Sequence, residues 1–554
     1  MRGATWMLLG VGSFTGVAAG QSLTFTTVVD NKSTLGGSGE TITAVNQVVL
    51  QDDNAVAAIV RFGDGGDTPS AITFNASSGN GSTQIVAKSG QPFSTFGVGG
   101  AGGFQEFYNL SSVGGAVTFG AGNFTLPGDR GIFRYAYNGG SPTNSTIHFE
   151  GSTLLDGANA SIDTDGGSLP AYGVNASGHV VFSAMTVAPS TPTDTQLIAR
   201  STNGGAAPAS RIIDTSSGIT KFNLTNNNAT TSFFPQRKLI TSSGHAVFVG
   251  DGGSGRQIYD IGPGPSLTPQ VRVPDSLGGG TYEVQRVLGA SGDAVTGTTL
   301  FHAFKNRPDP VPPSSPPDDF WPQGALMVTS PLGLREIGAF DTSLPSSNGE
   351  LAPPPTAVMT QNGRVAAFLP QDTGGRVVYY DVATGAASGT TVAEYGTAVG
   401  GGFTIKHVSM DYVSVPMVNA NGTVVFDAVI QNGADVRDAL LAWTPGSAAP
   451  FVVAKTGDTI TIGGENETIG QLSLDYSTFD GGLNPFPADL AYDGDVLKDG
   501  LNDNDYLAFA VRFDGAAGHA VLITHLPEPG MLVWLGPVLG AMLMRRPSRV
   551  RGRH

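Results

Sequence analysis

A short string recurs along this chain and limits the folds that the chain can adopt. The clearest copies read NASGHVVF at 175–182, NANGTVVF at 419–426 and NDNDYLAF at 502–509. Each begins with Asn, places Gly or Asp three residues later, and ends in an apolar stretch closed by Phe. Gly adopts positive φ at little cost, Asn and Asp next most readily, and a leading Asn bonds its own backbone in an Asx turn. The string therefore predicts a tight turn that leads into a strand buried on both faces.

Five weaker copies extend the pattern over most of the chain. They read TSSGHAVF at 241–248 and SVGGAVTF at 112–119, with more degenerate strings at 51–58, 289–296 and 360–367. The mean interval of about 64 residues exceeds the roughly 40 to 50 residues of common propeller blades, and it leaves room for four strands with long loops. The eight positions at which we expect positive φ are Asn54, Gly115, Gly178, Gly244, Gly292, Gly363, Gly422 and Asp505.

Further strands complete each repeat. The string VAKSG at 86–90 recurs as VAKTG at 453–457, and other strand-like runs lie between each turn and this second element. About seven or eight four-stranded repeats predict an all-β fold, a β-propeller, which protects its sheet edges by closing radially. Leu23–Val29 is a candidate for the strand that completes the last blade, and few helices are expected. An open array of β-sandwich domains is the alternative.

Composition restricts both chemistry and partners. The chain has no Cys, which excludes disulfides, thiolate metal sites and cysteine nucleophiles. Its formal net charge is −16, although six of its 29 basic residues lie in the two terminal segments. Nucleic acid and anionic lipid are therefore poor partners for the acidic middle of the chain.

The first 20 residues have the three-part layout of a secretory signal peptide. Arg2 precedes an apolar run from Trp6 to Val17, and small residues follow. Cleavage is expected after Ala19 or Gly20, and the run is too short to span a membrane. A buried N-terminal strand is the alternative interpretation.

The last 29 residues combine a short motif, an apolar segment and a basic tail. Pro527, Glu528 and Pro529 precede the apolar stretch Gly530–Met544, which the basic cluster Arg545 and Arg546 closes. The stretch predicts a short transmembrane helix of about 22 Å, less than the roughly 30 Å of a bilayer core. The positive tail should remain in the cytoplasm and hold the rest of the chain outside.

This order of parts resembles the PEP-CTERM sorting signal of Gram-negative bacteria, although Pro537 inside the apolar segment would kink a helix. The resemblance implies that the chain is an exosortase substrate, processed near the Pro-Glu-Pro and displayed at the cell surface or in an extracellular polysaccharide matrix. An ordinary tail anchor without processing is the alternative. The repeats also resemble a group of tandem-repeat surface proteins with an NxxGxxxF-like unit, which implies an architecture and a location but no activity.

These features divide the chain into a signal peptide at 1–20, a β-repeat ectodomain at 21–525 and a sorting or anchor segment at 526–554. Within the ectodomain, residues 306–323 hold seven prolines. Because proline cannot donate to a sheet ladder, this stretch predicts an exposed insertion loop, either a plain loop or a ligand-binding one.

The sequence contains no complete catalytic motif. Its eight histidines show no HExxH spacing, and neither a GxSxG elbow nor a P-loop is present. His179 and His245 occupy the same slot in two repeats, which favours a role in the fold. No cofactor is predicted, and metal binding is left open with weak calcium candidates on two acidic clusters, Asp163, Asp165, Asp493 and Asp495.

The predicted function is therefore that of an exported structural or binding protein, not an enzyme. Its expected partners are an exosortase-type enzyme, extracellular polysaccharide, and the membrane before processing. The alternative is a secreted hydrolase or lyase that acts on polysaccharide from a propeller scaffold.

Overall fold

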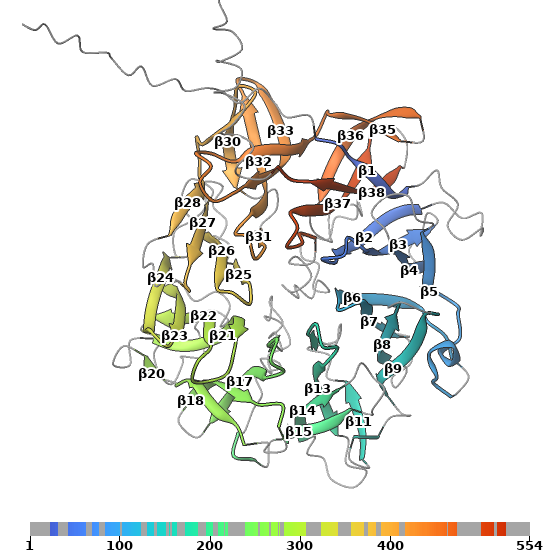
Figure 1. Cartoon of the computed structure of the whole chain (residues 1–554), viewed down its shortest axis with the longest axis vertical. Coiled ribbons are helices and arrows are strands. Elements are labelled where there is room, and N and C mark those ends of the chain that lie inside the picture. The colour runs from blue at the N-terminus through green and yellow to red at the C-terminus, as the bar shows by residue number, and fades with distance from the viewer. Residues whose placement is uncertain are drawn as a thin grey trace, which may run out of the picture.

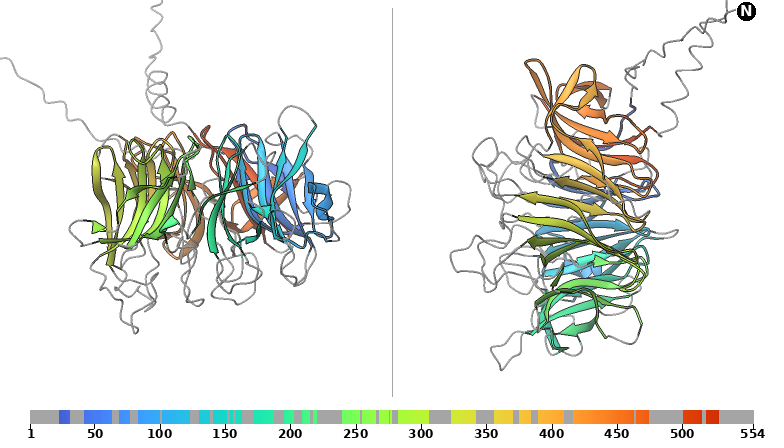
Figure 2. Two further views of the ribbon diagram at one scale, coloured as in Figure 1. Left: turned by 90° about the horizontal axis from the view of Figure 1, so that it is seen from below. Right: turned by 90° about the vertical axis from the view of Figure 1, so that its left-hand side faces the viewer.

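The chain folds into eight antiparallel sheets arranged around one axis (Figure 1), and the ring is a disc in side view (Figure 2). This confirms the β-propeller prediction, and the array of separate β-sandwiches is wrong. The computed structural model describes residues 23–30, 42–62, 69–76, 83–99, 102–122, 130–137, 141–150, 154–155, 158–162, 172–186, 195–202, 209–214, 217–219, 239–252, 255–264, 268–274, 276–277, 282–305, 323–341, 356–369, 375–383, 389–408, 416–462, 464–473, 500–514 and 518–527.

The predicted signal peptide, and the terminal segment from Glu528 onward, lie outside these residues. Within them, no helix has both the length and the apolar character needed to cross a bilayer.

Four blades consist of four strands each, which pair in chain order. Blade 1 comprises β2 (Ile42–Leu50), β3 (Val56–Phe62), β4 (Ser70–Asn75) and β5 (Gln84–Lys88); blade 2 comprises β6 (Glu106–Val113), β7 (Ala116–Gly122), β8 (Arg130–Ala136) and β9 (Thr143–Phe149). Blade 4 comprises β16 (Leu239–Ile240), β17 (Ala246–Gly252), β18 (Gly255–Ile261) and β19 (Gln270–Val273); blade 6 comprises β25 (Thr356–Met359), β26 (Arg364–Leu369), β27 (Arg376–Asp381) and β28 (Thr390–Ala393).

Three blades carry one or two additional short strands. Blade 3 comprises β10 (Leu154–Leu155), β11 (Ala158–Ile162), β12 (Tyr172–Val174), β13 (Val180–Thr186), β14 (Thr195–Ser201) and β15 (Ser210–Asp214). Blade 5 comprises β20 (Ser276–Leu277), β21 (Tyr282–Ser291), β22 (Thr298–Lys305), β23 (Gln323–Ser330) and β24 (Gly333–Asp341). Blade 7 comprises β29 (Ala398–Gly400), β30 (Phe403–Val408), β31 (Met417–Val418), β32 (Val424–Asn432), β33 (Asp435–Trp443) and β34 (Phe451–Lys455).

Blade 8 combines both ends of the chain and closes the ring. The N-terminal strand β1 (Thr26–Asp30) pairs antiparallel with β38, so the strand expected at Leu23–Val29 does complete the last blade. A ring closed in this way leaves no gap between the first and last blades. The other strands of blade 8 are β35 (Thr459–Ile462), β36 (Glu465–Ser473), β37 (Tyr506–Phe513) and β38 (His519–His525).

The eight predicted turn positions all have positive φ, between 59° and 87°. Asn54 and Asp505 are the two non-Gly residues with positive φ in the described part of the chain. In the blade 3 turn, the Gly178 N–H donates to the Asn175 carbonyl at 2.8 Å. The Asn175 Oδ1 accepts the backbone N–H groups of Ser177 and His179, at 3.1 and 3.0 Å. The repeat string thus encodes an Asx-stabilised turn that starts a strand.

The aromatic residue that ends the string lies in the core between blades. Because the following strand has a blade on either side, its apolar residues are buried on both faces, as the continuous apolar pattern predicts. The five such phenylalanines with at most 1% exposure are Phe119, Phe182, Phe248, Phe426 and Phe509. The second repeated element is also regular: Val86–Lys88 and Val453–Lys455 lie in β5 and β34, the last strands of blades 1 and 7.

Blade 5 departs from the pattern. The string predicts that the strand begins immediately after Gly292, but β22 begins only at Thr298, and Val295 is 76% exposed. The Asp293 Oδ1 accepts the N–H groups of Val295 and Thr296, at 2.8 and 2.6 Å, which diverts these groups from a sheet ladder. The Pro-rich loop also ends one residue earlier than predicted, because Gln323 is the first residue of β23.

All eight turns lie at the start of equivalent strands and therefore on one face of the disc, which we call the turn face. The hairpins that follow these strands, such as that between β32 and β33, lie on the other face, which we call the hairpin face.

Two glycines with nearly equal φ allow the packing of the turn to be tested separately from its backbone conformation. A Cβ on Gly422 would lie 2.7 Å from Tyr379 Oη in blade 6, whereas one on Gly446 would meet nothing within 4 Å. We expect Gly446→Ala to cost about 1–2 kcal/mol from backbone strain alone. Gly422→Ala should cost about 1–3 kcal/mol more, because Tyr379 must move. Chemical denaturation of both variants measures the difference, and equal costs would show that the close approach between blades is unimportant.

Candidate functional site

The turns of neighbouring blades are joined by side-chain hydrogen bonds on the turn face. While its Oδ1 holds its own turn, the leading Asn uses Nδ2 to reach the next blade. Asn175 donates to the Thr241 carbonyl at 2.9 Å, and Asn419 donates to the Asn502 carbonyl at 2.8 Å. Asn502 in turn donates to the Gln51 carbonyl at 2.8 Å, from blade 8 to blade 1. The repeat residue therefore links blades as well as shaping a turn.

Arginine side chains supply the links around blades 3 to 5. Arg200 of β14 donates to the Gly262 carbonyl at 3.0 Å, and Arg272 of β19 donates to the Gly292 carbonyl at 2.5 Å. Both arginines are buried, and burial lowers their pKa. Because carbonyl oxygens of the next blade accept their N–H groups, these charges are solvated by the protein.

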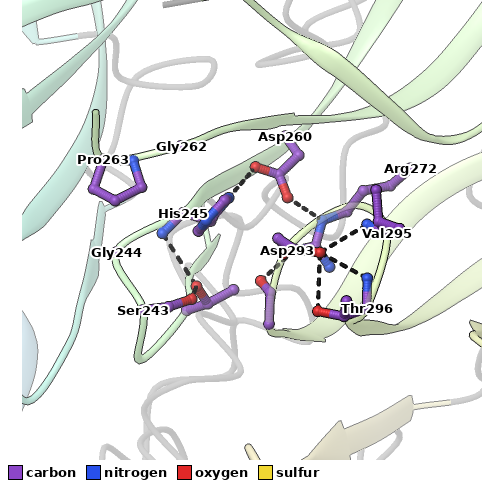
Figure 3. Close-up of polar contacts among 12 residues, drawn as sticks. Ser243, Gly244, His245, Asp260, Gly262, Pro263, Arg272, Asp293, Val295 and Thr296 are labelled. Carbon is purple, nitrogen blue, oxygen red and sulfur yellow. Dashed lines mark hydrogen bonds and ion pairs between the residues drawn. The ribbon is translucent and has the colours of Figure 1, made fainter. Parts of the chain in front are cut away.

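A histidine and an aspartate lie together in blade 4, next to these links (Figure 3). His245 follows the turn glycine Gly244, and Asp260 lies on the neighbouring strand β18. The His245 Nδ1 is 2.6 Å from Asp260 Oδ1. The Asp260 side chain is 2% exposed, whereas that of His245 is 21% exposed. A buried carboxylate therefore holds an imidazole whose ring reaches the turn face.

Arg272 occupies the other oxygen of the same carboxylate. Its Nε is 2.7 Å from Asp260 Oδ2, and both side chains are at most 2% exposed. Its Nη1 donates to the Ser291 carbonyl at 3.2 Å and to Thr299 Oγ1 at 3.1 Å. With both carboxylate oxygens engaged, Asp260 is fixed in position and in turn fixes the imidazole.

Two further titratable groups flank this pair. Burial, together with the charge of Arg200, lowers the pKa of His179, whose Nδ1 has no hydrogen-bond partner among the described residues. Hydrogen bonds from the Thr296 and Val295 backbone lower the pKa of the Asp293 carboxyl. Near neutral pH, His179 is thus favoured as neutral and Asp293 as charged.

The arrangement leaves one ring nitrogen for a ligand. With the His245 Nδ1 bound to Asp260, the Nε2 is available at the turn face, and it can accept a hydrogen bond or a proton. A carboxylate that orients the imidazole in this way is a recurrent feature of general bases and of histidines that contact ligands. In the described part of the chain, no group of three or more His, Asp or Glu residues could hold a metal.

The predicted site residues have different outcomes. The calcium candidates Asp163, Asp165, Asp493 and Asp495 lie outside the described residues, as do Glu528, Pro529, Arg545 and Arg546. Pro527 is described and is half-buried. The recurrence of its slot predicts a role in the fold for His245, and the structure adds a carboxylate partner. One feature of the sequence points to its partner Asp260. It is a charged residue within the strand-forming run Arg256–Ile261, in a chain that is only 13% charged.

Neither a protein-family model nor a curated protein sequence matches this chain. Among solved structures, an oligogalacturonate lyase in complex with manganese matches at 9% identity and a TM-score of 0.37, over 76% of this chain and 97% of the lyase. The β-propeller domain of the Trilobed protease from Pyrococcus furiosus matches at 9% identity and a TM-score of 0.34, over 74% of this chain and 95% of that domain. A Trypanosoma rangeli sialidase in complex with sialic acid matches at 10% identity and a TM-score of 0.29, over 89% of each chain.

These matches contradict the prediction that the chain is not an enzyme. Proteins named as a lyase, a protease and a sialidase are among them. At these identities the likeness concerns the fold alone and assigns no activity to this chain.

Proposed function

We propose that this chain is an exported β-propeller displayed at the cell surface, where its turn face binds extracellular polysaccharide. The observation that carries the proposal is the His245 imidazole, which Asp260 and Arg272 orient and which keeps Nε2 for a ligand. Sugar hydroxyls pair with a hydrogen-bonding group of this kind. The signal peptide at 1–20 and the sorting segment at 526–554 support export and display, with processing by an exosortase-type enzyme.

The same pair of residues favours a second candidate, cleavage of the polysaccharide. An imidazole held by a buried carboxylate can accept a proton from a sugar carbon or from water. In that case His245 is the general base of a lyase or hydrolase, and Asp260 is a positioning residue that fixes the ring.

One experiment separates binding from cleavage. The full-length chain in detergent is passed over immobilised extracellular polysaccharide from the producing cells, and the soluble polymer is then incubated with the chain. We expect retention that soluble polymer competes away, and a loss of roughly tenfold or more in affinity for His245→Ala. New reducing ends or unsaturated sugars, absent with His245→Ala, would establish cleavage.

His525 provides the matched control, because it is an exposed histidine at the end of β38, in blade 8. His525→Ala should retain wild-type affinity and melt at the wild-type temperature. His245→Ala removes one hydrogen bond of the buried Asp260, so the affinities of the two variants are compared at a temperature where both are folded. No retention of the wild-type chain, or equal retention of both variants, would contradict a binding role for His245.

A further inference from the structure

We infer that the turn face is the side of the propeller held towards the cell, and that the hairpin face points away from it. The inference rests on the proposed surface display and adds which side of the ring meets the ligand. It comes from the places at which the two ends of the fold leave blade 8.

The C-terminal end of the fold leaves at the turn face without a linker. In the β37–β38 ladder, Tyr506 pairs with His525, so β38 ends beside the turn that contains Asp505. The next residue, Leu526, is fully buried, and its N–H donates to the Asp505 carbonyl at 2.7 Å. Pro527 is therefore the first residue beyond the folded blade.

The N-terminal end leaves at the same place. Thr26 of β1 pairs with Ile523 of β38, and Thr524 Oγ1 donates to the Thr24 carbonyl at 3.0 Å. Strands β1 and β38 lie side by side in Figure 1. The predicted signal peptide and the sorting segment are thus both attached to one edge of the turn face.

Chain length limits how far the ring can stand from its anchor. Only three residues separate Leu526 from the apolar stretch that begins at Gly530, and three residues span at most about 11 Å. The strand β37 has eight residues and rises about 26 Å between the two faces. Until the sorting segment is processed, a tether much shorter than the blade is deep holds the turn face nearest to the membrane.

The negative charge of the turn face limits which molecules can lie between this face and the cell. Asp52, Asp53 and Asp503 are exposed on the turn face beside the exit. An anionic lipid surface would repel these carboxylates, so the face is not a lipid-docking surface. A hydrated polysaccharide of the cell's own envelope fits the gap, and His245 on the same face would contact it.

Two alanines on blade 7 provide a direct test, because the chain has no Cys of its own. Ala448 is exposed after β33 on the turn face, and Ala434 is exposed between β32 and β33 on the hairpin face. Ala434→Cys and Ala448→Cys are labelled on intact cells with a bulky, membrane-impermeant maleimide. We expect Ala434→Cys to react several-fold faster on cells, and the two variants to react equally in detergent.

A longer tether should abolish this difference. A flexible insert of roughly 20 residues between Leu526 and Pro527 spans about 25 Å on average and lets the ring turn over. Equal rates on cells without the insert, or faster labelling of Ala448→Cys, would overturn the orientation while leaving display intact. Chain found only in the medium would overturn surface display and the orientation with it.

Discussion

Asn502→Ala is expected to lower the free energy of unfolding by about 3–5 kcal/mol, a large effect for one side chain. Asn502 is 3% exposed and joins blade 8 to blade 1. Its Nδ2 donates to the Gln51 carbonyl and to Asn54 Oδ1, and its Oδ1 accepts two N–H groups of its own turn. Alanine removes all four of these hydrogen bonds at the place where the ring closes. Chemical denaturation, followed by intrinsic fluorescence, measures the loss.

Asn502→Asp separates the two roles of this residue. Aspartate keeps an oxygen for the turn but removes the donor that reaches blade 1, and it places a carboxylate against two acceptor oxygens. We expect a cost at least as large as that of alanine. Asn466→Ala is the control, because Asn466 is exposed in β36 and should change stability by less than about 0.5 kcal/mol. Wild-type stability in Asn502→Asp would show that Asn502 stabilises only its own turn and that its hydrogen bonds to blade 1 contribute nothing.

The sequence predicts those features of this fold that depend on local backbone conformation. A positive φ must be occupied by Gly, Asn or Asp, and the strand after it must be apolar where it has a blade on each side. Both requirements are visible within eight residues, which is why the sequence alone predicts the turn positions. The turn at Gly292 is an exception: no strand begins directly after it, because the carboxylate of Asp293 accepts the N–H groups that a strand would use.

The seams on the two sides of blade 8 explain the two turns that lack glycine. Asn54 Oδ1 accepts a hydrogen bond from Asn502, and Asp505 Oδ1 accepts one each from Asn419 and Thr423. A side chain at positive φ costs backbone strain, and here it contributes hydrogen bonds between blades that glycine cannot make. The sequence shows the substitution but gives no reason for it, since the partners are up to 448 residues away.

The candidate site could not be predicted for a related reason. Asp260 and Arg272 lie in different strands, and the groups that hold Arg272 belong to the next blade. No spacing rule connects such residues before the blades are placed around the ring. His179 and His245 occupy the same slot of the repeat, but their surroundings differ. His245 has Asp260 as a partner, whereas His179 lies against Gly244 of the next turn.

Asp260→Asn should cost about 3–5 kcal/mol, because it leaves the buried guanidinium of Arg272 without its counter-charge. Arg272→Met should cost a similar amount, because it leaves Asp260 buried with His245 alone. The double variant removes both charges together. We therefore expect it to be more stable than the sum of the single costs predicts, by about 1–3 kcal/mol. Denaturation of the four proteins gives this coupling energy.

The same variants test whether the Asp260–Arg272 ion pair is needed for binding to polysaccharide. If Asp260 orients His245, Asp260→Asn should weaken retention on polysaccharide nearly as much as His245→Ala does, at temperatures where both proteins are folded. Arg211→Met is the matched control, because the Arg211–Asp214 pair is an ion pair of equal length, 2.7 Å, with its arginine side chain 44% exposed. An exposed pair contributes about 0–1 kcal/mol, so this variant should keep both stability and retention. Additive costs in the cycle would show that Asp260 and Arg272 do not stabilise each other. Full retention in Asp260→Asn would show that His245 contacts polysaccharide without help from Asp260.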